Sequence, residues 1–174
     1  MEKKVYAVSQ KHFEQILSTR KLTDENIVEQ NTAFIQIKNT FDDNQSNYEF
    51  KLKDTKNVLS LKFDDCDEEI KHEIIGTIEY ISAIPMSEEQ GKQILDFINK
   101  NKDKETFLIH CHAGISRSGG VSKFISEYFG LTEQEYRNMN PSCRPNQRII
   151  NILRKLNYST NLSSNDEDEI LESK

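Results

Sequence analysis

The chain has 174 residues, a length typical of a single domain with a substantial core. Its formal net charge of −6 argues against a protein held mainly by nucleic-acid phosphates or by an anionic membrane. Three cysteines without a secretory spacing pattern, and no apolar signal region or membrane-length run, predict a cytoplasmic protein. We expect a monomer with neither nucleic acid nor membrane as partner.

Predicted strands dominate the first third of the chain. Apolar or alternating runs predict strands over residues 5–8, 32–37, 48–52 and 58–63. Between the first two strands, Ser9 can cap a helix that presents Phe13 and Leu17 on one face. The polar residues 39–47 are predicted to form a connecting loop.

A cluster of acidic residues, 64–69, follows the last of these strands directly. Open α/β sheets bind their ligands beyond the carboxyl ends of strands, so this cluster is a candidate part of a site. The same acids can also cap a following helix at its positive end, and both interpretations can hold. Isoleucines at helical spacing then predict a helix over residues 68–83.

The next elements lead to a polar loop at residues 110–120. Ser87 and Gln90 form a capping-box pattern that opens a helix, and a lysine-rich turn closes it. The apolar run 106–109 then predicts a buried strand. Beyond the loop, residues 121–129 predict an amphipathic helix that ends at Gly130.

This loop carries a cysteine near its start and an arginine near its end. A loop that enters a helix points its unpaired N–H groups inward and forms an anion site. Such groups, with a guanidinium, lower the pKa of the Cys111 thiol below its free value of about 8.5 and make it a nucleophilic thiolate. The planar fork of Arg117 fits two phosphate oxygens, and Gly114 permits the bend. The Ser118 hydroxyl is placed to hydrogen-bond the sulfur.

Residues 111–118 read C-x-x-G-x-S-R-S, and they resemble the active-site loop of the cysteine-dependent protein phosphatases. The chain is most similar to the small dual-specificity and tyrosine phosphatases of microbes and viruses. The resemblance implies an α/β fold with a central, mostly parallel sheet of four or five strands and helices on both faces. It implies Cys111 as nucleophile, Arg117 as phosphate ligand and Ser118 as support for the departing thiolate, with no metal or cofactor. The phosphate-binding residues that it implies are His112, Ala113, Gly114, Ile115, Ser116 and Arg117.

The reaction also needs a proton donor for the leaving oxygen, which this loop does not supply. The family takes an aspartate from a separate loop upstream. Because residues 61–65 resemble the strand-then-acid pattern of the small dual-specificity enzymes, we expect Asp65 to be this acid. Asp64 is the next alternative, and Asp67 is the third.

Several residues near the loop have candidate supporting roles. His110 and His112 flank the cysteine, but further ligands at zinc spacing are missing, so His110 is expected to shape the loop through a hydrogen bond. Cys66 could trap Cys111 as a reversible disulfide, or it is simply a small half-buried residue. Cys143 lies in a polar loop and is assigned no role.

The C-terminal part contains two more predicted helices. Thr132 and Glu135 form a second capping box, and the Pro145-Asn146 pair resembles the one that opens the final helix of dual-specificity phosphatases. In that case Asn146 gives structural support. Gln147 either reaches the site to orient water or is an exposed residue of the first turn.

The polar, acidic residues from Ser159 onward predict a division into a phosphatase domain, 1–158, and a mobile tail, 159–174. We expect hydrolysis of phosphotyrosine, with phosphoserine and phosphothreonine as further candidates, in a protein or peptide through a phosphocysteine intermediate. A non-protein phosphoester and an RNA 5′-triphosphate are alternative substrates, since relatives act on both. A phosphate-binding module without turnover and a rhodanese-like sulfur carrier are the alternatives outside this enzyme class.

Overall fold

Four parallel strands form the centre of the computed structural model, which describes residues 3–40, 49–72 and 81–172. The strands are β1 (Lys4–Ser9), β2 (Thr32–Lys38), β3 (Val58–Lys62) and β6 (Thr106–Cys111). They lie in the order β1-β6-β2-β3, and every pairing is parallel. The predicted α/β fold with a parallel central sheet is confirmed.

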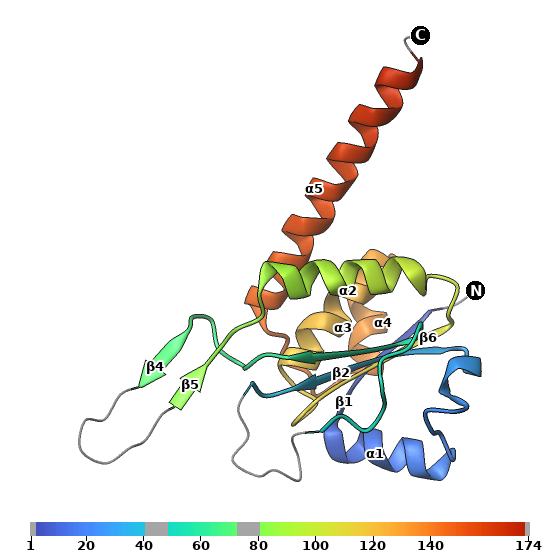
Figure 1. The fold of residues 1–174 in the computed structure, drawn as a ribbon, viewed down its shortest axis with the longest axis vertical. Helices are drawn as coiled ribbons and strands as arrows, with labels where there is room; N and C mark the ends of the chain where they lie inside the picture. The colour runs from blue at the N-terminus through green and yellow to red at the C-terminus, as the bar shows by residue number, and fades with distance from the viewer. Residues whose placement is uncertain (1–2, 41–48, 73–80, 173–174) are drawn as a thin grey trace.

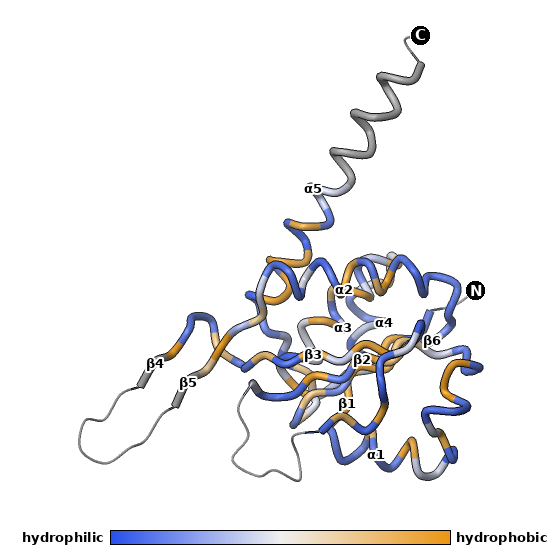
Figure 2. Tube along the Cα trace, viewed as in Figure 1, coloured by the Kyte–Doolittle hydropathy of each residue, from blue (hydrophilic) through white to orange (hydrophobic). Residues whose placement is uncertain are grey.

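Helices cover both faces of this sheet (Figure 1). They are α1 (Gln10–Thr19), α2 (Glu88–Lys100), α3 (Arg117–Tyr128), α4 (Glu133–Met139) and α5 (Gln147–Glu172), with a short 3-10 helix η1 (Ile27–Glu29). Helix α1 lies on one face, and α2, α3, α4 and the start of α5 lie on the other (Figure 1). Apolar residues are concentrated in the strands and the facing helices (Figure 2). The larger core cluster joins the strands to α2, α3 and α5, and the smaller one joins them to α1.

The predicted helix starts are confirmed by their capping bonds. The Ser9 hydroxyl accepts the N–H of His12 at 3.2 Å, which opens α1. Full capping boxes open α2 at Ser87 and α4 at Thr132. Gly130 follows α3 with φ +74°, a backbone conformation that favours glycine.

Strand β6 brings the predicted nucleophile to the centre of the sheet's carboxyl edge. It lies between β1 and β2, with Ser9 opposite Cys111 on one side and Gln36 opposite His110 on the other. Cys111 is the last residue of β6. The loop that follows therefore starts where three strands end side by side, the position at which parallel sheets bind ligands.

The helix predicted over residues 68–83 is not found where the structure describes this stretch, at residues 68–72 and 81–83. Strand β4 (Ile70–His72) instead pairs antiparallel with β5 (Ile81–Ala83), and residues 73–80 lie outside the described residues. The two strands form a separate small sheet that projects from the body (Figure 1). Isoleucine is β-branched and suits strands, and a short apolar run does not distinguish the two structures by its spacing alone.

The half-exposed strand predicted over residues 48–52 is also wrong for the part that the structure describes, residues 49–52. Leu52 is buried there, and its N–H and C=O both bond to the side-chain amide of Gln36, at 3.2 and 2.9 Å. The side-chain amide of the buried Gln36 thus makes the backbone hydrogen bonds to Leu52 that a neighbouring strand would otherwise make. Of the loop predicted over 39–47, residues 41–47 lie outside the described residues.

Helix α5 extends to Glu172, so the backbone of the acidic segment from Ser159 onward continues this helix. This part projects beyond the helices that cover the sheet (Figure 1). The division at residue 158 stays a prediction. Within the described residues, no helix has the length and apolar character needed to cross a bilayer.

Candidate active site

The candidate site lies on the turn between β6 and α3. Cys111 ends the strand, Arg117 begins the helix, and residues 112–116 connect them. The turn contacts the end of β1: the N–H of Gln10, which follows β1, donates to the carbonyl oxygen of His112 at 3.1 Å. The strand, loop and helix predicted for this motif are therefore all present.

Gly114 is the residue that allows this close approach. Its φ is +73°, and a Cβ there would lie 2.3 Å from the backbone N of Ser9 and from the carbonyl carbon of Val8. Such distances are far inside van der Waals contact, and the contacted atoms are backbone that cannot turn aside. Only glycine fits at this position.

The Cys111 thiol is buried, with 3 % of the residue exposed, and two groups bond its sulfur. The N–H of Gly114 donates to Sγ at 3.3 Å, and the Ser118 hydroxyl lies 3.2 Å from it. Burial opposes ionisation, but the hydrogen bonds from Ser118 and Gly114 and the charge of Arg117 outweigh it and lower the pKa of Cys111. The direction of this shift favours the thiolate form of Cys111.

The Arg117 guanidinium is also buried, with 6 % of the residue exposed. Its Nη1 donates to the carbonyl oxygen of Phe63, just beyond β3, at 2.8 Å. Its Nε has no hydrogen-bond partner within residues 3–40, 49–72 and 81–172, although it is buried. A buried N–H of this kind calls for an explanation, and an anion bound in the loop would supply the acceptor.

The structure brings Asp65 to the loop. Its Oδ1 accepts the Ser116 hydroxyl at 2.7 Å and the side-chain amide of Asn146 at 2.9 Å. A carboxylate from the segment after β3 therefore lies against the same loop that carries the thiol and the guanidinium.

The two alternative acids are placed differently. The Asp64 carboxylate accepts the backbone N–H of Thr40 at 3.1 Å and that of Ile84 at 2.8 Å, so it ties the base of the β4–β5 pair to the end of β2. Asp67 is exposed, and it makes no hydrogen bond to the loop within the part of the chain that the structure describes. Of the three aspartates, Asp65 is the one bonded to the loop.

His110 lies beneath the loop with 1 % of the residue exposed. Its ring packs on Phe13 with the ring centroids 4.4 Å apart, and its Nδ1 lies 3.4 Å from the carbonyl oxygen of Cys111. Burial lowers its pKa to about 4, so the ring is neutral at neutral pH. His112 is exposed on the loop, away from this buried position.

The structure does not bring Gln147 into the loop. Its side chain is exposed, and its amide nitrogen lies 3.4 Å from the carbonyl oxygen of Pro145 on its own segment. Cys66 is half-buried, and burial, followed by the charge of Asp64, raises the pKa of its thiol. That direction disfavours a thiolate at Cys66.

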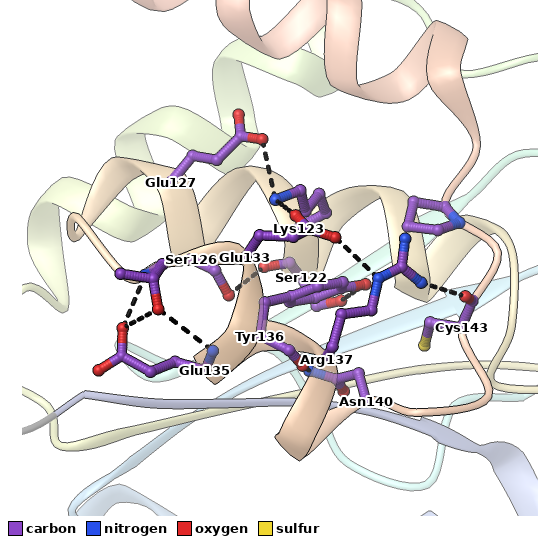
Figure 3. Close-up of polar contacts among 12 residues, drawn as sticks. Ser122, Lys123, Ser126, Glu127, Glu133, Glu135, Tyr136, Arg137, Asn140 and Cys143 are labelled. Carbon is purple, nitrogen blue, oxygen red and sulfur yellow. Dashed lines mark hydrogen bonds and ion pairs between the residues drawn. The ribbon is translucent and has the colours of Figure 1, made fainter.

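A buried polar cluster behind the loop was missed by the sequence analysis (Figure 3). The Tyr136 hydroxyl on α4 donates to the carbonyl oxygen of Gly119 at 3.2 Å, and the Ser122 hydroxyl lies 3.4 Å from it. Burial raises the pKa of Tyr136 well above its usual value. The buried Cys143 thiol, which was assigned no role, donates to the carbonyl oxygen of Gly114 at 3.5 Å. The signal available in the sequence was Tyr136 itself, an aromatic residue in the otherwise polar segment that follows Thr132.

The chain was compared with family models, curated proteins and solved structures. No family model matches the chain, and the search of curated proteins finds no match. Solved phosphatase-like structures resemble this chain. The human tyrosine phosphatase-like serine/threonine/tyrosine-interacting protein matches at 15% identity over 88% of this chain and 87% of its own, with a TM-score of 0.49.

Two further structures match over similar lengths. Tk-PTP in its active form is 20% identical over 71% of this chain and 77% of its own, with a TM-score of 0.39. PTPMT1 in complex with PI(5)P is 12% identical over 83% of this chain and 88% of its own, with a TM-score of 0.46. These likenesses concern the fold alone, and function depends on the residues of the loop and the groups around it.

Proposed function

We propose that this chain is a cysteine-dependent protein phosphatase that hydrolyses phosphotyrosine in proteins or peptides. The observation that carries this proposal is the hydrogen bond between Asp65 and Ser116. It joins a carboxylic acid to the loop that carries Cys111 and Arg117, which supports a nucleophile, a phosphate ligand and a proton donor acting together. A thiol nucleophile needs reducing conditions, which fits the expected cytoplasmic location.

In the first step the substrate phosphate docks against the N–H groups of the loop and the Arg117 guanidinium. These donors bind the oxygens most strongly in the transition state, when charge on them is spread out. The Cys111 thiolate attacks phosphorus in line, so a P–S bond forms while the P–O bond to tyrosine breaks. Asp65 gives its proton to the leaving phenolate oxygen.

In the second step water attacks the phosphocysteine. The Asp65 carboxylate takes a proton from this water as a new P–O bond forms and the P–S bond breaks. The electron pair of that bond returns to Cys111 as a thiolate, which the Ser118 hydroxyl stabilises by its hydrogen bond. Release of inorganic phosphate restores the starting enzyme, and no step needs a metal.

The charge of the loop favours a phosphate monoester over a substrate with several phosphates. Residues 112–116 contain no lysine, so Arg117 is the one permanently charged side chain between positions 111 and 118. A single guanidinium with backbone donors matches one tetrahedral dianion. Phosphoinositides and RNA 5′-triphosphates carry additional negative charge near the reacting group, and the loop offers no second cation for it.

Turnover of para-nitrophenyl phosphate by the purified chain tests the proposal. We expect hydrolysis that vanadate inhibits and that Cys111→Ser abolishes, while Cys111→Ser still binds a phosphotyrosine peptide. Cys66→Ser removes a different thiol and should keep activity within about threefold, as expected for a residue outside the chemistry. Absence of turnover in the wild-type chain, with peptide binding retained, would establish a binding module instead.

Substrate class is tested by comparing kcat/KM for phosphotyrosine, phosphoserine and phosphothreonine peptides, a phosphoinositide and an RNA 5′-triphosphate. We expect the phosphotyrosine peptide to be the best substrate. Comparable rates on phosphoserine and phosphothreonine peptides would extend the assignment to dual specificity. A higher kcat/KM for the lipid or the RNA would overturn the proposed substrate and leave the cysteine mechanism in place.

A further inference from the structure

A short segment before helix α5 holds the outer side of the active-site loop. We call residues 143–146 the clamp segment. Its Cys143 thiol, Arg144 N–H and Asn146 N–H donate to the carbonyl oxygens of Gly114, Ile115 and Ser116, at 3.5, 3.1 and 3.1 Å respectively. Three successive carbonyl groups of the loop are therefore bonded to the clamp segment, which holds the backbone of the loop on that side.

Asn146 extends this clamp to the acid. Its side-chain Oδ1 accepts the N–H of Ile149 in the first turn of α5 at 3.1 Å, as an N-cap residue does. Since that oxygen faces an N–H donor, the amide nitrogen must face the other way, and it donates to Asp65 Oδ1 at 2.9 Å. The start of α5 thus fixes which end of the amide meets the carboxyl group.

The two carboxylate oxygens of Asp65 differ in their hydrogen bonds. Oδ1 accepts from both the Ser116 hydroxyl and the Asn146 amide, so it is the oxygen without the proton. Oδ2 makes no hydrogen bond to any described residue. When Asp65 is protonated, its proton therefore lies on Oδ2.

We propose that Asn146 is a positioning residue for the general acid: by holding Oδ1 of Asp65 it directs the proton on Oδ2 toward the leaving oxygen of the substrate. This inference rests on the proposed phosphatase function. In the first step the proton moves from Oδ2 to the leaving oxygen as the P–O bond breaks. In the second step Oδ2 takes it back from the attacking water.

Two variants separate this role from simple support of the helix. Asn146→Asp keeps an oxygen that can accept the Ile149 N–H, but it replaces the donor to Asp65 by a second carboxylate oxygen. Asn146→Ser also keeps a good N-cap oxygen, and its side chain is too short to reach Asp65. Ser87→Ala is the matched control, because it removes the equivalent capping bond of α2 without touching the loop or Asp65.

The test compares two substrates that depend differently on the acid. The phenolate of para-nitrophenyl phosphate leaves readily, whereas that of phenyl phosphate needs its proton more. We expect both Asn146 variants to lower kcat/KM for phenyl phosphate at least about tenfold more than for para-nitrophenyl phosphate, as loss of an oriented acid does. Ser87→Ala should leave this ratio unchanged. Vanadate affinity and the rate of Cys111 alkylation should also stay unchanged in the Asn146 variants, because neither needs a proton donor.

A double variant gives the decisive comparison. If Asn146 acts through Asp65, adding Asn146→Asp to Asp65→Asn produces no further change in the substrate ratio. The proposal is overturned if the single Asn146 variants lower both substrates equally, if they weaken vanadate binding in parallel with the rate, or if the effects of Asp65→Asn and Asn146→Asp multiply.

Failure of the proposed function would look different. Then the wild-type chain would hydrolyse neither substrate, and no ratio could be measured. A wild-type enzyme that is active and blocked by vanadate, with an unchanged substrate ratio in both Asn146 variants, would refute the role of Asn146 alone.

Discussion

Ser116 and Asp65 are separated by 51 residues along the chain, yet the serine hydroxyl donates to the aspartate carboxylate at 2.7 Å. Ser116 stands directly before Arg117 in the loop between β6 and α3, and Asp65 follows the edge strand β3. The contact therefore connects two strand ends of one parallel sheet. The neighbouring Asp64 makes different contacts, because its carboxylate accepts the backbone N–H groups of Thr40 and Ile84.

This difference predicts opposite outcomes for the two alanine variants. Asp65→Ala should lower kcat on an aryl phosphate by about 10²- to 10⁴-fold, the range for loss of a general acid, with little change in the melting temperature. Asp64→Ala should keep activity within about tenfold and lower the free energy of unfolding by about 1–3 kcal/mol, because it leaves two backbone N–H groups without their acceptor. Steady-state kinetics and urea unfolding measure both. The reverse pattern would transfer the acid role to Asp64.

The Ser118 hydroxyl should affect both the ionisation of the Cys111 thiol and the release of the Cys111 thiolate when the phosphocysteine breaks down. Its hydrogen bond helps to lower the pKa of Cys111, so Ser118→Ala should raise that pKa. The pH dependence of iodoacetamide alkylation reports it: alkylation increases as pH rises through the pKa, and its midpoint should move upward in the variant.

Ser118→Ala should also slow breakdown of the phosphocysteine more than its formation. A burst of phenol release followed by a slower steady state would show this in rapid-mixing kinetics. An unchanged alkylation midpoint together with burst-free kinetics would contradict the role assigned to the serine.

His110 predicts an acid-sensitive component of stability. Its pKa in the folded state is about 4, below the ordinary value of 6.5, because burial disfavours the charged ring. Between these pH values the unfolded chain binds a proton that the folded chain does not. The free energy of unfolding should therefore fall as pH decreases from about 6.5 to about 4, by a total of about 3 kcal/mol from this group.

The variant His110→Phe keeps an aromatic ring against Phe13 and has no group to protonate. Urea unfolding of both proteins at several pH values isolates the histidine's contribution, since the carboxylates titrate in both. The free energy of unfolding of the wild-type chain, taken relative to that of His110→Phe, should fall by about 3 kcal/mol as pH decreases from about 6.5 to about 4. Parallel curves over this range would refute the assignment.

Two glycines with similar backbone angles should respond very differently to alanine. Gly114 has φ +73° and a Cβ there would meet the backbone of Ser9 and Val8 at 2.3 Å, whereas Gly130 has φ +74° and no atom within 4 Å of the added Cβ. Gly130→Ala should cost only the strain of positive φ, about 1–2 kcal/mol. Gly114→Ala should cost several kcal/mol more and abolish vanadate binding, because the loop must move away from β1. Thermal unfolding and vanadate titration compare the two, and equal costs would contradict the close approach.

The sequence alone determined the features that depend on neighbouring residues. The motif at residues 111–118, the capping residues Ser9, Ser87 and Thr132, and the strand before the loop are all local patterns, and the structure contains these elements. Local patterns suffice because a cap or a strand-to-helix turn is built from groups within a few residues of one another. The short isoleucine-rich stretch was the exception, since its β4–β5 pairing depends on residues about ten positions apart.

The tertiary structure decided the features that depend on distant residues. It placed Asp65, and not Asp64, in contact with the loop, placed Asn146 against that carboxylate, and gave the backbone of Leu52 a glutamine side chain from β2 as its partner. Asp64 and Asp65 are neighbouring residues of the same type, so a sequence pattern cannot tell which of them contacts the loop. They contact different neighbours because they lie beyond the end of β3, where the chain bends, and only the folded chain determines which carboxylate reaches the loop.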